Sequence, residues 1–148
     1  MSVPKNLVLM RKFLLIAAIF AVAASFSCKK AIQQKEENLI IQAVTSGRWY
    51  VQLYMDTTTD VTAEFSPYQF QFYQNNTVDA IIGSSTRSTG TWNGDINNYT
   101  ITATFPANAG DTLLRLNHVW KITDSYTNYV EAQTANGSTN NILHLRQF

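Results

Sequence analysis

The chain has 148 residues, carries 11 Lys and Arg against 10 Asp and Glu, and has a formal net charge of +1. This length predicts one domain, and the sparse, dispersed basic residues argue against a nucleic-acid-binding face. The single cysteine, Cys28, excludes an intramolecular disulfide, so apolar packing has to hold the core.

The segment that ends at Cys28 has the layout of a secretory signal. Arg11 and Lys12 form a positive n-region, an apolar h-region runs over residues 13–24, and small residues lead to the cysteine. Three interpretations compete: a transmembrane helix, an ordinary cleaved signal and a lipoprotein signal. The apolar run is shorter than the about 20 residues that a membrane-spanning helix needs. Ordinary cleavage would leave an unpaired thiol in a secreted protein, which is uncommon.

The lipoprotein interpretation rests on a resemblance. Ser27 directly precedes Cys28, and the segment resembles the signals of bacterial lipoproteins, with Ser25 and Phe26 similar to the looser sites of Bacteroidota lipoproteins. The resemblance implies a lipid on Cys28, which would hold the mature chain on a membrane without spanning it. We therefore predict a lipid-anchored protein of the cell envelope, on the outer membrane, with the face of that membrane left open.

These features divide the chain into three parts. Residues 1–27 are the predicted lipoprotein signal, with Met1 or Met10 as the start, residues 28–37 are a tether, and residues 38–148 are one domain. Without the signal, eight basic and ten acidic residues remain, a net charge of −2.

One helix is predicted in the mature chain. Over residues 31–46, Ile32, Leu39 and Val44 share one face at helical spacing, and Gly47 follows as a C-terminal stop.

From Trp49 onward the apolar period changes to two, which is typical of strands. In the first strand, Trp49, Val51, Leu53 and Met55 are expected on one face. Strands are predicted over residues 49–55, 68–72, 78–82, 90–92, 99–105, 113–122, 126–132 and 142–148.

Asparagine-rich dipeptides separate several of these strands. Asn75-Asn76, Asn93-Gly94 and Asn136-Gly137 are predicted turns, and Asn-Gly is a strong hairpin signal. Short strands at regular spacing indicate a sandwich or barrel rather than βαβ units. The predicted fold class is all-β, a small antiparallel up-and-down barrel of seven or eight strands, preceded by one short helix.

Gly47-Arg48-Trp49 opens the first strand after a helix, which is the place of the Gly-x-Trp signature of lipocalins. Thr123-Asp124-Ser125-Tyr126 is similar to the family's Thr-Asp-Tyr turn, and Arg146 occupies the place of its C-terminal arginine. The domain resembles the short lipocalin-like domain of Bacteroidota lipoproteins. The resemblance implies that Gly47, Trp49 and Arg146 close the barrel, with the Arg146 guanidinium over the Trp49 indole.

An eight-stranded barrel has room for packed side chains or for one small ligand. If a lumen exists, alternating apolar residues form its wall; otherwise the same residues form the core. This predicted wall consists of Phe70, Phe72, Trp92, Tyr99, Ile101 and Trp120.

No enzymatic motif is present in the sequence. The two histidines, His118 and His144, lack a metal-ligand spacing with another His, Cys or carboxylate. A nucleophile elbow and a phosphate-binding glycine loop are also missing. We therefore predict a protein that is not an enzyme and that uses neither a cofactor nor a metal.

Three functions stay open. The first is binding of a small apolar or amphipathic ligand in the barrel. The second is a protein-interaction or envelope-structural module with a filled barrel, whose face would include Tyr50, Tyr54, Tyr73 and Tyr129. The third is glycan binding on exposed aromatic rings.

Overall fold

The structure, a computed structural model, describes residues 41–135 and 139–148. The predicted signal, the tether and the Asn136-Gly137 turn therefore lie outside the described residues, as does the larger part of the predicted helix. Residues 41–45 are helical. Within the described ranges, the helices are too short or too polar to cross a membrane.

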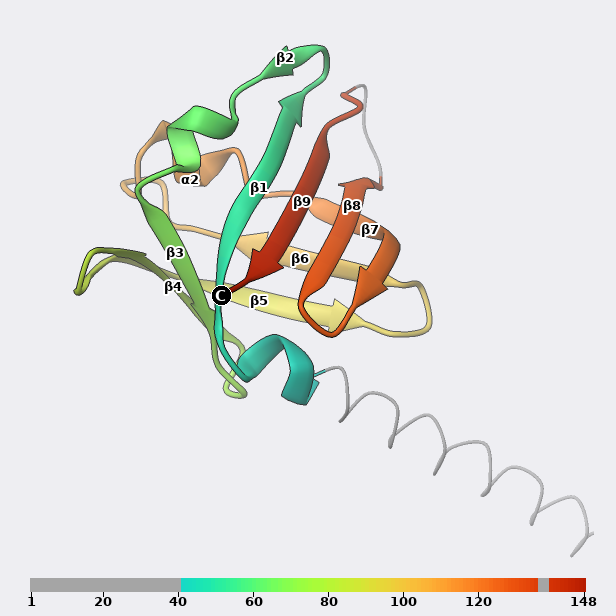
Figure 1. Ribbon diagram of the computed structural model, residues 1–148, viewed down its shortest axis with the longest axis horizontal. Helices are drawn as coiled ribbons and strands as arrows, with labels where there is room; N and C mark the ends of the chain where they lie inside the picture. The colour runs from blue at the N-terminus through green and yellow to red at the C-terminus, as the bar shows by residue number, and fades with distance from the viewer. Residues whose placement is uncertain (1–40, 136–138) are drawn as a thin grey trace, which may run out of the picture. The chain divides into compact units, whose positions relative to one another are not determined.

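The described chain forms one antiparallel sheet with short helical connections (Figure 1). The order of the strands in the sheet is β2-β1-β3-β4-β5-β6-β7-β8-β9. The elements are β1 (Arg48–Asp56), β2 (Thr59–Asp60), η1 (Thr62–Phe65), β3 (Tyr68–Phe72), β4 (Thr77–Ile82), β5 (Ser85–Asp95), β6 (Thr100–Thr104), α2 (Asp111–Leu114), β7 (Val119–Tyr126), β8 (Tyr129–Thr134) and β9 (Ile142–Gln147).

The sheet closes on itself. Strand β1 pairs with β9, from Trp49 opposite Gln147 to Met55 opposite Ile142. Eight strands, β1 and β3 to β9, thereby form an up-and-down barrel, and β2 adds two residues beside the end of β1. The predicted fold class and number of strands are confirmed.

The antiparallel order gives the barrel two different ends. We call the end where β1 begins the entry end; it holds the helical residues 41–45 and the turns after β3, β5 and β7. We call the opposite end the cap end, because η1 and α2 lie in its connections. Figure 1 shows the helical residues before β1 on one side of the sheet and β2 and α2 on the other.

Apolar side chains from all eight barrel strands or their connections meet inside. Period-two alternation turns every second residue of a strand inward, which gives one continuous core. Its buried members are Trp49, Val51, Tyr54, Phe65, Phe70, Phe72, Val78, Ala80, Trp92, Phe105, Leu113, Leu116, Trp120, Ala132 and Leu143.

A bulge corrects the predicted faces of the first strand. The register of β1 against β9 shifts between Val51 and Leu53. An inserted residue reverses the alternation beyond it, so Tyr54 is fully buried whereas Leu53 and Met55 are only partly buried. The prediction that Tyr54 belongs to an exposed face was therefore wrong.

The Asn93-Gly94 dipeptide does not form the turn that was predicted there. Both residues pair with β6 inside the long strand β5, and the turn follows over residues 96–99. The Asp95 carboxylate accepts hydrogen bonds from the backbone N–H groups of Asn97 and Asn98. This aspartate-centred turn places the reversal downstream of the Asn-Gly signal.

The segment before β7 is also different from the prediction. A strand was expected from residue 113, but α2 occupies Asp111–Leu114, and Leu113 and Leu116 are both buried at helical spacing. Asn117 then satisfies both backbone polar groups of Phe105 with its side-chain amide. The predicted turn over residues 123–126 lies within β7, and the chain reverses at residues 127–128.

Candidate functional site

Four of the predicted wall residues, Phe70, Phe72, Trp92 and Trp120, are buried and pack against other aromatic side chains. Phe72 lies edge-on to Trp92, with ring centroids 5.6 Å apart, and Phe70 meets Phe105 at 6.3 Å. Trp120 packs edge-on against Tyr54 at 5.8 Å. Such tilted pairs are the favourable geometry of packed aromatic rings, so these side chains act as core.

Two wall residues behave differently from the rest. Ile101 is partly buried and packs against the core. Tyr99 was expected on the same face but is exposed, because it lies in the turn before β6 with a positive φ of 51°. Its placement in a lumen wall was wrong: Tyr99 is the last residue of the turn over residues 96–99, so the alternation of β6, which begins at Thr100, does not include it.

All three indole N–H groups are used by backbone carbonyls. Trp49 donates to the Val44 carbonyl at 2.9 Å, and Trp92 donates to the Tyr73 carbonyl at 2.9 Å, both at the entry end. Trp120 donates to the Leu116 carbonyl at the cap end, at 3.0 Å. A buried N–H without a partner is unfavourable, so the indoles hold the segments that close the barrel rather than point at a ligand.

Gly47 lies where the helical residues turn into β1. A Cβ atom at Gly47 would lie only 2.5 Å from Gln147 Nε2, so the side chain of the last strand passes directly over this position. Gln147 in turn donates a hydrogen bond to the Ser46 hydroxyl, at 3.1 Å. The first and last strands thus meet closely at the entry end.

Arg146 does not lie over Trp49 as the resemblance implied. The register places it opposite Tyr50 and Tyr129, on the outer face of the sheet, whereas Trp49 points into the core. Its guanidinium carbon lies 5.4 Å from the centroid of the Tyr129 ring. The reason is the period of two: neighbouring positions across β1 and β9 put the arginine and the indole on opposite faces.

Arg146 belongs to a group of polar side chains on the outside of β1, β8 and β9. Tyr129 Oη lies 3.1 Å from His144 Nδ1 and 3.3 Å from Glu131 Oε2. His144 Nε2 lies 3.7 Å from Glu131 Oε1. Arg146 Nε donates to Gln52 Oε1 at 3.2 Å. We call these residues the outer cluster: Gln52, Tyr129, Glu131, His144 and Arg146.

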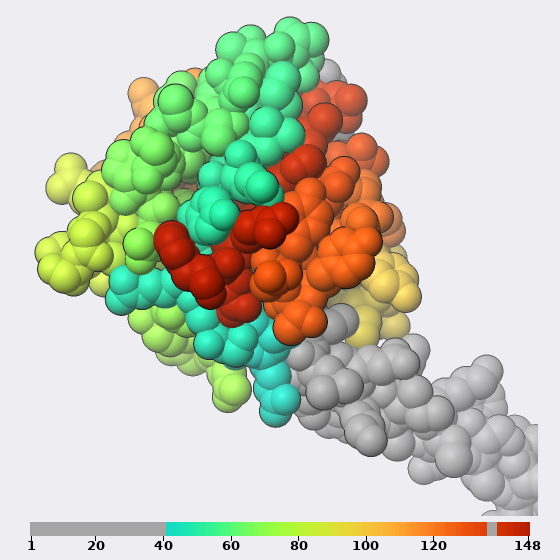
Figure 2. Space-filling view, in the orientation of Figure 1, coloured from blue at the N-terminus to red at the C-terminus, as the bar shows by residue number. Residues whose placement is uncertain are grey.

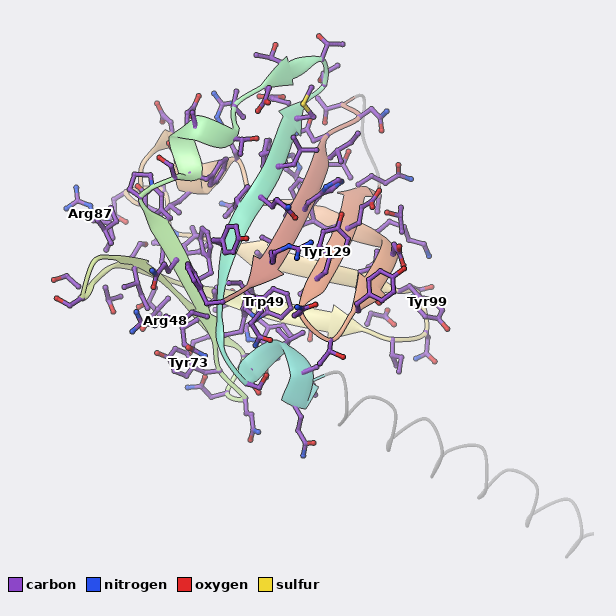
Figure 3. The ribbon with its side chains drawn as sticks, viewed as in Figure 1. Arg48, Trp49, Tyr73, Arg87, Tyr99 and Tyr129 are labelled. Atoms are coloured by element: carbon purple, nitrogen blue, oxygen red, sulfur yellow. The ribbon has the colours of Figure 1, made fainter. Side chains whose placement is uncertain are left out.

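Alternation along two strands builds the outer cluster. Tyr129 and Glu131 are two apart on β8, His144 and Arg146 are two apart on β9, and the register pairs them crosswise. Figure 3 shows Tyr129 on this outer face, and Figure 2 shows the surface of β8 and β9 beside β1.

The environment of the outer cluster raises the pKa of the Tyr129 phenol. Partial desolvation raises the pKa of Tyr129, and the negative charge of Glu131 and the hydrogen bond to it raise it further. The phenol therefore stays protonated at neutral pH and can donate a hydrogen bond. It does not provide a phenolate nucleophile or base.

The cap end holds a second polar group, in which Tyr54 and Asn141 are buried and Arg115, Asp56 and Glu64 are partly exposed. Tyr54 Oη donates to the Arg115 carbonyl at 2.6 Å and receives a longer contact from Asn141 Nδ2 at 3.4 Å. Burial raises the pKa of Tyr54 to about 12. The Arg115 guanidinium pairs with Asp56 and lies 3.3 Å from Glu64 Oε2. These contacts explain the closure of this end.

An open groove runs over the outside of β5 and β6. It has a volume of about 400 Å³ and is lined chiefly by uncharged polar side chains. The lining residues are Asn76, Thr91, Trp92, Asn93, Thr102 and Thr104.

Among the described residues, no three His, Cys, Asp or Glu side chains gather into a group that could hold a metal ion. His118, which the sequence analysis singled out, packs edge-on against Trp120 with ring centroids 5.5 Å apart.

Comparisons with known proteins support the fold. The structure is similar to the 1.00 Å crystal structure of a DUF4847 family protein from Bacteroides vulgatus, with a TM-score of 0.51 and 14% sequence identity. The likeness covers 72% of this chain and 96% of that chain. No model of a protein family matches the sequence, and neither does any curated protein. At this identity the likeness shows the barrel fold alone.

Tyr129 and His144 were singled out in the sequence, but a contact between their side chains was not predicted. A two-residue turn at Asn136-Gly137 would have set Tyr129 opposite His144, whereas the observed register sets it opposite Arg146. The alternation of residues in β8 and β9 could have predicted that both side chains lie on the outer face.

Proposed function

We propose that this protein is a lipid-anchored, non-enzymatic protein of the cell envelope that binds a partner protein on the outside of a filled barrel. The observation that carries the proposal is the interior: Phe70, Phe72, Trp92 and Trp120, which were expected to line a lumen, are buried in one packed core. The three indole N–H groups are used by the chain itself. This arrangement favours the filled-barrel function over a ligand in the lumen.

The partner protein binds at the outer cluster. Tyrosine and arginine are enriched among the residues that dominate binding energy at protein interfaces. Here their side chains are already held by hydrogen bonds and by the contact between Arg146 and Tyr129. Side chains that are ordered before binding lose less conformational freedom when a partner docks.

The anchor rests on the sequence around Cys28. Two or more acyl chains hold a protein stably on a membrane, whereas one holds it only marginally. A lipid-modified N-terminus would therefore keep the barrel at the membrane and leave its outer faces available to other envelope proteins.

A small-to-large substitution tests the filled interior. Ala132 is buried on β8, and Ala132→Leu should lower the free energy of unfolding by about 1–3 kcal/mol, because a packed core has no space for the added methyl groups. The matched control is Gln133→Leu, at the next and exposed position. Equal stability of the two variants in urea titrations, together with a stoichiometric apolar molecule in a solvent extract of the purified protein, would favour the ligand-binding function instead.

Metabolic labelling with an alkynyl fatty acid tests the anchor. The full chain should incorporate the label, Ser27→Ala should keep it because the residue before the cysteine stays small, and Cys28→Ala should lose it. Label that remains on the Cys28→Ala protein would contradict an anchor at this residue.

Site-specific photo-crosslinking in cells tests the docking face. A benzoylphenylalanine at Gln52 should give one discrete protein adduct, and Arg146→Ala should abolish that adduct. The control position is Thr91, on a different outer face of the barrel. Adducts of equal yield at both positions would argue against a docking site at the outer cluster.

A further inference from the structure

Exposed aromatic side chains gather at one end of the barrel. Among the described residues, the large apolar or aromatic side chains that remain exposed include four aromatic ones: Tyr73 at 40%, Tyr99 at 61%, Tyr126 at 67% and Phe148 at 74%. The two exposed aliphatic ones, Ile82 and Val119, lie at strand ends on the opposite side of the barrel.

The topology places all four aromatic residues at the entry end. Tyr73 follows β3, Tyr99 precedes β6, Tyr126 is the last residue of β7 and Phe148 follows β9. Because neighbouring strands are antiparallel throughout, these strand ends all lie where β1 begins. Figure 3 shows Tyr73 and Tyr99 beside the strand ends at the entry end, away from Arg87, which lies near the start of β5. We call these four residues the aromatic rim.

The rim side chains are supported by the residues beside them. Tyr99 keeps a left-handed backbone, which is uncommon for a bulky residue, while its carbonyl accepts a hydrogen bond from the Ile122 N–H at 2.8 Å. The Lys121 ammonium lies 5.7 Å from the centroid of its ring. The structure thus presents this ring to solvent in a fixed turn.

The other rim residues are also held in place. Tyr73 Oη donates to Asp79 Oδ2 at 3.2 Å. The rings of Phe148 and Tyr50 lie 4.9 Å apart, and those of Tyr126 and Tyr129 lie 6.3 Å apart. Each of the four exposed aromatic side chains thus has a neighbouring residue in contact with it, and the four lie on separate connections or strand ends of the entry end.

The chain enters the barrel at this same end. The described residues begin at Ile41, and Cys28 precedes it by thirteen positions (41 minus 28). An extended chain of that length reaches at most about 45 Å. A lipid on Cys28 would therefore keep the entry end within about 45 Å of a membrane.

We propose that the entry end of the barrel rests on the lipid bilayer, with the aromatic rim in the headgroup region. Tyrosine is enriched at membrane–water interfaces, because its ring is apolar and its hydroxyl group is hydrated. The inference rests on the anchor of the proposed function and adds an orientation to it: the side of the barrel stays free for a partner.

Charge is not the source of this contact. The positive charges of the basic side chains near the rim are offset by carboxylates on the same strands and turns. The aromatic rings therefore have to supply the attraction to the bilayer. Among the described residues, the charged residues on the strands and turns near this end are Arg48, Lys121 and Arg146 with Asp79, Asp95, Asp124 and Glu131. The contact should therefore persist on vesicles without anionic lipid.

Fluorescent probes at the two ends test the orientation. In the lipidated chain Cys28 is acylated, so an introduced cysteine is the only free thiol available for an NBD label. Thr127→Cys places the label in the exposed turn beside the rim, and Ser84→Cys places it in the exposed turn at the cap end. Both proteins are reconstituted in phosphatidylcholine vesicles, with or without phosphatidylglycerol, that contain brominated acyl chains.

The expected result is quenching of the label at residue 127 that is severalfold stronger than at residue 84, in both kinds of vesicle. Adding Tyr99→Ser and Tyr126→Ser should reduce that quenching severalfold while the protein stays on the vesicles. A label at residue 127 that is as open to water as that at residue 84 would overturn the orientation and leave the anchor intact.

Two other outcomes would also overturn the inference. A label at residue 127 that is shielded from water but not quenched by brominated lipid would indicate a protein on the rim. Protein that carries no lipid and does not remain on the vesicles would remove the anchor, and the inference with it.

Discussion

The two ends of the barrel are closed in similar ways, but their exposed side chains differ in chemical character. At both ends, a short helical segment is held by a buried aromatic side chain that donates a hydrogen bond to a backbone carbonyl: Trp49 to Val44 at the entry end, and Trp120 to Leu116 at the cap end. Outside this closure, the entry end exposes aromatic rings, whereas the cap end carries acidic groups, namely Asp56, Asp60, Glu64 and Asp111.

This difference separates stability from function. Closing a barrel requires only that the core is covered and that buried polar groups are paired. The character of the exposed side chains beyond that is free to serve an interaction. The internal tryptophans therefore stabilise the fold, and under the proposed orientation the exposed aromatic side chains contact the membrane.

The largest expected effect is at the entry end. Trp49→Ala removes a buried indole and leaves the Val44 carbonyl without its donor, so the free energy of unfolding should fall by about 3–5 kcal/mol. Urea titration followed by circular dichroism measures the loss. Tyr50→Ala, at the next position and only partly buried, is the control and should lose clearly less. Equal losses would mean that Trp49 does not close the barrel.

A smaller effect is expected from the cap end. Tyr54→Phe keeps the ring but removes the hydroxyl group that donates to the Arg115 carbonyl, so about 1–3 kcal/mol of stability should be lost. Tyr73→Phe is the control, because its hydroxyl group is exposed and bonds to an exposed carboxylate. If the Tyr54→Phe variant were as stable as the Tyr73→Phe variant, the hydrogen bond of Tyr54 would not stabilise the closure of the cap end.

The pH dependence of the free energy of unfolding tests the contribution of Tyr54 at the cap end in a second way. Burial raises the pKa of Tyr54 from 10.0 to about 12. Its contribution is therefore complete below about pH 10, where the phenol is protonated in both states, and is lost as the pH rises toward about 12. Two pKa units correspond to about 3 kcal/mol. Unfolding titrations across this window should show a steeper loss for the native chain than for Tyr54→Phe; parallel curves would contradict the assignment.

The smallest effect is expected at the outer cluster. Arg146→Ala removes a cation from the partly exposed ring of Tyr129 and should lower stability by about 0.5–1 kcal/mol. A double-mutant cycle with Tyr129→Leu should reveal coupling, whereas a cycle with Trp49→Phe should reveal none. Coupling to Trp49 instead would restore the arrangement that the lipocalin resemblance implied.

Much of the fold could be predicted from local patterns. Alternating apolar residues predicted a closed antiparallel sheet with the observed number of barrel strands, and Asn75-Asn76 marked a turn that the structure has. The failures are also local in origin. Asn93-Gly94 predicted a turn three residues before the observed one, which begins at residue 96, because the Asp95 carboxylate stabilises the later reversal.

The candidate sites were harder to predict, because they depend on register. The bulge in β1 decides that Tyr54 is inside, and the pairing of β9 with β1 and β8 decides that Arg146 meets Tyr129. Neither feature leaves a signal in the amino-acid order of one strand. The aromatic rim likewise comes from four residues far apart in the sequence.

By itself, the sequence determined the class of the fold and the alternation of inner and outer faces, because a period of two is a property of each strand alone. Only the tertiary structure decided that the interior aromatics fill the barrel, which residues form the outer cluster, and that the exposed aromatics share one end. These outcomes require the closure of the sheet and the relative shift of its strands, since contacts between distant segments exist only once the barrel has formed.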